Sequence, residues 1–133
     1  MRNVVLVALL LAACRKEDAA PPPAVLGAVP FVAGSDACGK AIDHVVKLQA
    51  DMMASFPDAE AAKVTRIMNL VGARMAASCR EMAWPTEATD CLRATKNVQE
   101  AEQCDGKMTA DQRAARDRVG QAAVDEVEAS SPR

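Results

Sequence analysis

Four cysteines constrain the fold of this chain more than any other feature of its sequence: Cys38, Cys79, Cys91 and Cys104. Zinc sites usually present pairs of cysteines about two to four residues apart, whereas the intervals here are far longer. Disulfide bonds are therefore favoured over a structural metal. Only two phenylalanines and one tryptophan occur in the 133 residues, so the core is expected to be thin and cross-links would compensate for it.

The N-terminus predicts export and a lipid anchor. Arg2 precedes the apolar run Val4 to Leu10, an order typical of a secretory signal peptide and too short to span a membrane. Leu11-Ala12-Ala13-Cys14 follows and resembles the lipobox of bacterial lipoproteins, in which the cysteine is diacylated and becomes the first residue after cleavage. The resemblance implies that residues 1–13 are removed and that Cys14 joins the chain to a membrane. The alternative is an ordinary signal peptide followed by chance by a cysteine.

Residues 14–34 are predicted to form the anchor and a tether. Arg15 stands where an inner-membrane lipoprotein often has Asp, so the resemblance favours the outer membrane. Pro21-Pro22-Pro23 and Pro30 favour partly polyproline II backbone, which at about 3 Å per residue could reach roughly 50 Å. The stretch Ala24 to Val32 is more apolar than a free linker requires. It is interpreted as a cover over the core, or else as a docking segment for a partner.

Residues 35–129 are predicted to form an all-α domain that begins with a helical hairpin. The first helix should start at Ser35 or Asp36 and run to about Ser55, and the second should follow Pro57 and run to about Met82. Apolar residues recur every three or four positions in both helices, which predicts one buried stripe on each. The stripes consist of Cys38, Ala41, Ile42, Val45, Leu48, Met52 and Phe56, and of Ala61, Val64, Met68, Val71, Met75, Ser78 and Met82.

Three further helices are expected after the hairpin. Thr86 can cap a short helix, Asn97 with Glu100 a second one ending near Cys104, and Thr109 with Gln112 a last helix over residues 110–129. The predicted inner side of the last helix is Ala115, Val119, Ala122 and Ala123, and residues 130–133 should fray. The fold class is thus a small disulfide-stapled helical bundle.

Turn positions help to choose the disulfide pairing. The midpoint between Cys38 and Cys79 lies at the Pro57-Asp58 turn, so an antiparallel hairpin places these two residues at the same height. The midpoint between Cys91 and Cys104 lies at the Asn97 break. Cys38–Cys79 with Cys91–Cys104 is the favoured pairing. The rival pairs Cys79 with Cys91 about Pro85 and Cys38 with Cys104, and it stays open at this point.

No catalytic residue is predicted. His44 is the only histidine, Glu87 and Asp90 lie three residues apart, and none of the three belongs to a recognisable nucleophile, phosphate-binding or metalloprotease motif. The 16 basic and 18 acidic residues are spread without blocks of one sign, which argues against nucleic acid as a partner. No cofactor or metal is predicted. Copper is the alternative, through His44 and soft thioether ligands: Met52, Met53, Met68, Met75 and Met82.

The mature part has Cys38 opening one long helix, Cys79 near the end of another, and then Trp84-Pro85-Thr86-Glu87 leading to Cys91 and Cys104. This arrangement resembles small four-cysteine helical lipoproteins of myxobacterial type, a group without a characterised activity. We therefore expect a lipid-anchored, non-enzymatic interaction or structural module with an unknown envelope protein as its partner. The alternative function is a copper-binding lipoprotein.

Overall fold

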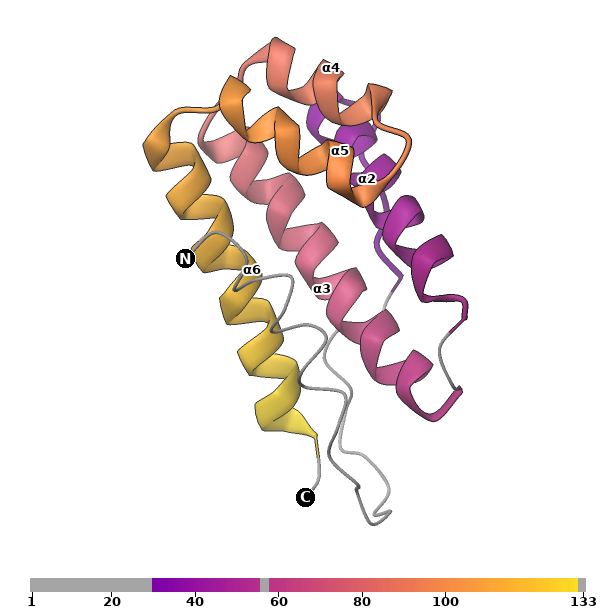
Figure 1. The fold of residues 1–133 in the computed structure, drawn as a ribbon. Helices are drawn as coiled ribbons and strands as arrows, with labels where there is room; N and C mark the ends of the chain where they lie inside the picture. Colours follow the sequence, from indigo (N-terminus) through magenta and orange to yellow (C-terminus); the bar gives the residue numbers. More distant parts are fainter. Residues whose placement is uncertain (1–29, 56–57, 132–133) are drawn as a thin grey trace.

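A computed structural model describes residues 30–55 and 58–131, and the predicted all-α fold is confirmed for them. Three long helices lie side by side, with α3 between α2 and α6, and the short helices cross one end of the bundle (Figure 1). No helix in this part of the chain is long and apolar enough to span a membrane. The elements are α2 (Ala37–Met53), α3 (Asp58–Glu81), α4 (Thr86–Ala94), α5 (Val98–Gln103), the 3-10 helix η2 (Cys104–Lys107) and α6 (Ala110–Ser130).

Helix α2 begins where the sequence predicts, because Asp36 satisfies one of its free N-terminal amides. The Asp36 carboxylate accepts a hydrogen bond of 2.8 Å from the backbone N–H of Gly39. Ala41 and Ile42 are buried, but Met52 is 43% exposed, so its assignment to the buried stripe is wrong. The short helices cover only the N-terminal part of α2, and its last turn projects beyond them (Figure 1). Phe56 lies outside the described residues.

Helix α3 is the central helix of the bundle. It packs against α2 on one side and α6 on the other, and therefore buries residues beyond the predicted stripe, among them Ile67 and Ala76. The assignment of Met82 to the stripe is wrong, because α3 ends at Glu81 and Ala83 adopts a positive φ of 47°. Met82 consequently falls in the turn and is 36% exposed.

The short helices close the end of the bundle where α3 stops. Trp84 is buried in the core there, directly before Pro85. Pro85 is the N-cap of α4 and Thr86 is already helical, so the predicted Thr86 cap is wrong by one residue. The fixed φ of proline suits the entry to a helix without a side-chain cap. The Asn97 cap of α5 is confirmed, since its side chain accepts a hydrogen bond from the Glu100 N–H.

Helix α6 starts with the predicted capping box of Thr109 and Gln112, which is confirmed. The prediction of its inner side is partly wrong, because Ala122 is exposed and the buried residues include Ala123, Val124 and Val127. Val124 and Val127 pack with Ile67 of α3. Burying valine removes more apolar area from water than burying alanine does, so the helix turns its valines inward.

The two disulfide bonds are Cys38–Cys79 and Cys91–Cys104, with Cα–Cα distances of 5.8 and 5.7 Å. These are the pairs that the turn positions favour, and the rival pairing does not occur in the structure. The first bond joins the start of α2 to the end of α3, and the second joins α4 to η2. Cys79 and Cys104 are fully buried, so both bonds lie partly inside the core.

The two disulfide bonds close loops of different length, with sequence separations of 41 and 13 residues, so they should contribute unequally to the free energy of unfolding. Replacing Cys38 and Cys79 together by alanine should lower the free energy of unfolding by about 4 kcal/mol, and replacing Cys91 and Cys104 by about 3 kcal/mol. Urea denaturation followed by circular dichroism measures both. Non-reducing peptide mapping of the unsubstituted protein is the control, and a peptide joining Cys79 to Cys91 would contradict the pairing.

Candidate functional site

The segment that precedes α2 lies against the hairpin. The ring of Phe31 packs on the core, and its backbone N–H donates a hydrogen bond of 3.3 Å to Asn69 Oδ1 on α3. Gly72 allows this approach, because a Cβ there would meet the Phe31 ring and Val46 at 3.1 Å. For Phe31 the interpretation as a cover over the core therefore holds. Residues 24–29 of the same apolar stretch lie outside the described residues.

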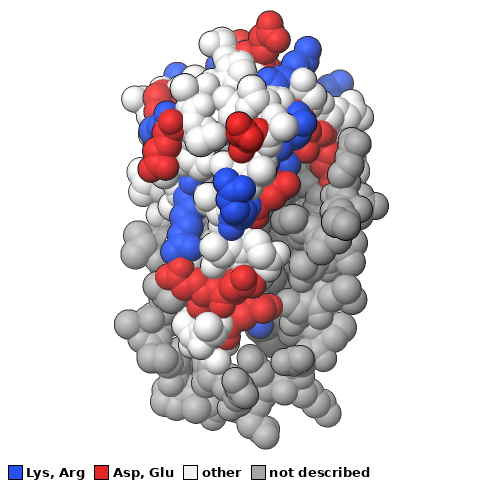
Figure 2. Space-filling view, turned by 90° about the vertical axis from the view of Figure 1, so that its left-hand side faces the viewer, with Lys and Arg blue, Asp and Glu red and all other residues white. Residues whose placement is uncertain are grey.

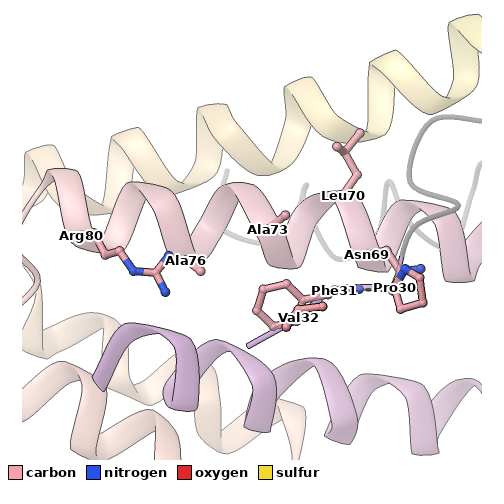
Figure 3. Close-up of a pocket in the computed structure, with 8 residues that line it drawn as sticks. All are labelled: Pro30, Phe31, Val32, Asn69, Leu70, Ala73, Ala76 and Arg80. Carbon is pink, nitrogen blue, oxygen red and sulfur yellow. Dashed lines mark hydrogen bonds between the residues drawn. The ribbon is translucent and has the colours of Figure 1, made fainter. Parts of the chain in front are cut away.

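An open groove of about 420 Å³ runs between this segment and α3 (Figure 3). Its lining is apolar except for Asn69 and Arg80 at its two ends, and Val32 at its rim is 82% exposed. Apolar side chains of modest size would fit such a groove. The lining residues are Pro30, Phe31, Val32, Asn69, Leu70, Ala73, Ala76 and Arg80.

An ion pair occupies the end of the groove near the start of α2. The Arg80 guanidinium donates to both carboxylate oxygens of Asp36, at 2.6 and 2.9 Å. Together with the Gly39 N–H, this bidentate contact lowers the pKa of Asp36 to about 2. Asp36 thus caps α2 and also pairs with Arg80 at the end of α3. Asp36 lies two residues before Cys38, and Arg80 directly follows Cys79, so the ion pair is close to the disulfide bond.

The candidate acid and base residues lie away from the groove. His44 Nε2 is 2.7 Å from the carbonyl oxygen of Thr95, so the imidazole connects α2 to the end of α4. Glu87 and Asp90 are exposed on α4, where Asp90 pairs with Arg93 at 3.3 Å. The structure therefore does not bring these residues together into one pocket, and it gives each of His44 and Asp90 a structural contact.

The candidate copper ligands are also dispersed. Met52 lies at the end of α2 next to the hairpin turn, whereas Met82 follows α3 at the opposite end of the hairpin. Met68 is buried in α3, about 20 Å along the helix axis from Met82. Within residues 30–55 and 58–131, no group of three or more His, Cys, Asp or Glu side chains could hold a metal ion.

Sequence reasoning missed the Asp36–Arg80 pair and the groove. A signal for the pair exists, because Arg80 follows Cys79 and the favoured disulfide brings Cys79 beside Cys38, two residues from Asp36. No comparable signal exists for the groove, which depends on where the segment before α2 lies. The sequence also gives no sign of the environment of Trp84. Its indole N–H is buried and finds no hydrogen-bond partner among the described residues.

Comparison with known proteins gives no relative for this chain. No family model matches it, and neither a curated protein nor a solved structure does. Cys14, the predicted lipidation site, lies outside the described residues.

The lowered pKa of Asp36 predicts that acid weakens the contact between the start of α2 and the end of α3. Its carboxylate should stabilise the fold fully above its unfolded pKa near 3.8, and this contribution should disappear as the pH falls towards about 2. Asp36→Asn keeps a residue able to cap α2 but removes the charge. The stability difference between the protein and this variant, measured by urea denaturation, should be largest at neutral pH and vanish near pH 2. A difference that is constant with pH would contradict the assignment.

The contact between Gly39 and the segment before α2 gives a second test. A Cβ at Gly39 would collide with the backbone of Gly34, so Gly39→Ala should destabilise the protein by about 2 kcal/mol despite the higher helix propensity of alanine. Gly106→Ala is the matched control, since a Cβ there meets nothing within 4 Å. Thermal denaturation compares the two, and equal stabilities would show that residues 30–34 do not lie against α2.

Proposed function

We propose that the protein is a lipid-anchored component of a bacterial cell envelope that acts by binding another envelope protein and not by catalysis. The observation that carries the proposal is the pair of disulfide bonds. Such bonds persist in oxidising compartments outside the cytoplasm, which is where the signal sequence and the lipobox-like residues ending at Cys14 would send the chain.

The length of chain between Cys14 and the first described residue supports the role of the N-terminus as a tether. Among the described residues Phe31 is the first that packs on the core, and 15 residues lie between Cys14 and Pro30. Extended at about 3 Å per residue, this length corresponds to roughly 45 Å. A bundle held at that distance could reach a partner in the same membrane or in the layer next to it. The outer membrane is the proposed location, through Arg15 after the lipidated cysteine.

The contacts of the polar side chains support an interaction role over a catalytic one. Arg116 bridges Asp105 and Asp117, with the Asp105 contact bidentate, and so connects η2 to α6. Gln112 is buried and donates to the carbonyl oxygen of Met82 at 3.0 Å. With the Asp36–Arg80 pair, these contacts fix the helices relative to one another. Helices held in one arrangement suit complexes in which the backbone of the interface changes little on binding.

The anchor is tested by replacing Cys14 with alanine in the full chain. The unsubstituted protein should enter the detergent phase of a detergent–water partition and carry the mass of a diacylglycerol group, because the acyl chains are buried in micelles. Cys14→Ala should remain in the aqueous phase without that mass. The unsubstituted protein and Cys14→Ala differ only at residue 14. Both should therefore fold alike, and Cys14→Ala is the matched control for the partition. An unmodified protein in the aqueous phase would contradict the anchor.

The binding role is tested in the same cells by chemical crosslinking. The anchored protein should yield a reproducible crosslinked species with a protein of the envelope, and Cys14→Ala should yield less of it because it is no longer confined to the membrane. Failure to capture any partner under several growth conditions would contradict the binding role while leaving the anchor intact.

A further inference from the structure

The groove between α3 and the segment before α2 exposes apolar surface on the described part of the chain. Among its lining residues Ala76 is buried, whereas Ala73 and Val32 are exposed. Arg80 is the only ionisable residue of the lining, and its charge is already paired with that of Asp36. An occupant of the groove therefore gains by removing apolar area from water and needs no charge of its own.

The described part of the chain starts at one end of this groove. Pro30, the first described residue, lies beside Asn69 at this end, and Arg80 lies at the other end (Figure 3). The segment that starts at Pro30 runs along the groove towards Arg80, since a Cβ at Gly34 would lie 2.5 Å from Arg80 Nη2. Val29 is joined to Pro30, with the two Cα atoms about 3.8 Å apart across the peptide bond. The chain outside the described residues therefore ends at the wall of the groove.

The six residues before Pro30 have the composition that the groove requires. Residues 24–29 are Ala-Val-Leu-Gly-Ala-Val, without a charge or a polar side chain, whereas residues 15–18 are all charged. Residues 69–80 of α3 span about 16 Å along the helix axis, and six extended residues cover about 20 Å. Gly27 allows the chain to reverse and lie alongside Pro30, because glycine adopts positive φ without a steric penalty.

The side of the molecule where α6 lies is less suited to such a segment. Figure 2 shows basic and acidic side chains distributed among the uncharged ones on this side. Arg118 and Asp125 of α6, for example, are both exposed. An apolar segment that covered charges of this kind would remove them from water without giving them a partner, which costs free energy. The groove carries no such cost, because its one charge is paired.

Covalent attachment favours residues 24–29 over any other occupant of the groove. A segment joined to its site by a short chain has an effective concentration in the millimolar range. A second copy of the protein, or a free partner with an apolar segment, would have to exceed that concentration or bind more tightly. The ordering of six backbone residues opposes docking, whereas the burial of Val25 and Leu26 favours it. These opposing contributions make docking reversible.

We propose that residues 24–29 dock reversibly in the groove beside α3, so that the tether has two lengths. With the segment released, the tether is the 15 residues between Cys14 and Pro30. With the segment docked, only the nine residues 15–23 remain, which correspond to about 27 Å when extended. This inference deepens the proposed function, because the two lengths set how far from the membrane the bundle meets its partner. The consequence for reach rests on the anchor at Cys14, but the docking itself does not.

Limited proteolysis of the full chain in phosphatidylcholine vesicles tests the docking. Thermolysin, which cleaves beside accessible apolar residues, should cut within residues 24–29 only slowly in the unsubstituted protein. Ala73→Glu places an unpaired charge in the groove and leaves the sequence of the cleaved segment unchanged. It should speed this cleavage at least about fivefold, because the rate follows the population of the released segment. Mass spectrometry of the fragments locates each cut.

Ala114→Glu is the matched control, because it makes the same substitution at an exposed alanine of α6 that does not line the groove. It should leave the cleavage rate unchanged, and circular dichroism checks that both variants keep their helices. Equal rates for Ala73→Glu and the unsubstituted protein would overturn the proposal and leave the groove to a partner. Protection that disappears on dilution would also overturn it, since a second copy would then be the occupant.

The same assay on Cys14→Ala in buffer separates docking from anchoring. Ala73→Glu should speed cleavage by the same factor in this background, because the contact between residues 24–29 and α3 does not involve the lipid. An unmodified Cys14 would contradict the anchor and leave this result unchanged. Loss of the effect of Ala73→Glu in both backgrounds would overturn the docking and leave the anchor intact.

Discussion

The junction between the start of α2 and the end of α3 is the constraint on which the rest of the structure depends. A covalent bond, Cys38–Cys79, and a bidentate ion pair, Asp36–Arg80, connect the same two helix ends. Both helices are therefore fixed in register at the end that carries most of the core. Ala41, Ile42, Ala76 and Trp84 pack there with the residues of α4 and η2. Towards the other end, the hairpin is less covered and Met52 is exposed.

The remaining elements extend this junction with specific polar contacts in place of a large apolar core. The second disulfide connects α4 to η2, and Arg116 connects η2 to α6 through Asp105. Gln112 then connects the start of α6 to the turn after α3. In a chain with one tryptophan and two phenylalanines, such contacts give the helices a single arrangement that hydrophobic burial alone would specify poorly. The fold is defined by its connections as much as by its core.

The fold could be predicted from the sequence because its signals are local. Prolines, capping residues and helical periodicity gave the helices to within a few residues, and the Thr109 capping box and the Asn97 cap occur as expected. The errors arose where the outcome depends on tertiary contacts. Ala122 is as suitable for burial as Ala123 by residue type, but the valines of α6 determine which face meets α3. The exposure of Met52 likewise depends on how far the short helices extend, which no local pattern records.

The candidate sites were less predictable for the same reason. The groove exists only because Phe31 crosses α3 at Asn69, 38 residues away in the chain. The sequence did contain one usable pointer, the adjacency of Arg80 to Cys79, which would have placed Arg80 beside the cap of α2.

The position of the Cys38–Cys79 bond has a mechanical consequence. A pull on the N-terminus, such as a membrane anchor would transmit, loads the segment before α2 first and would peel Phe31 away from α3. The peeling then reaches Asp36 and, two residues later, a covalent cross-link to the helix at the centre of the bundle. Beyond that point the force passes through the disulfide into α3, so α2 cannot unravel from its own N-terminus. The bundle would therefore withstand tension in the tether at the cost of only a few residues of its surface.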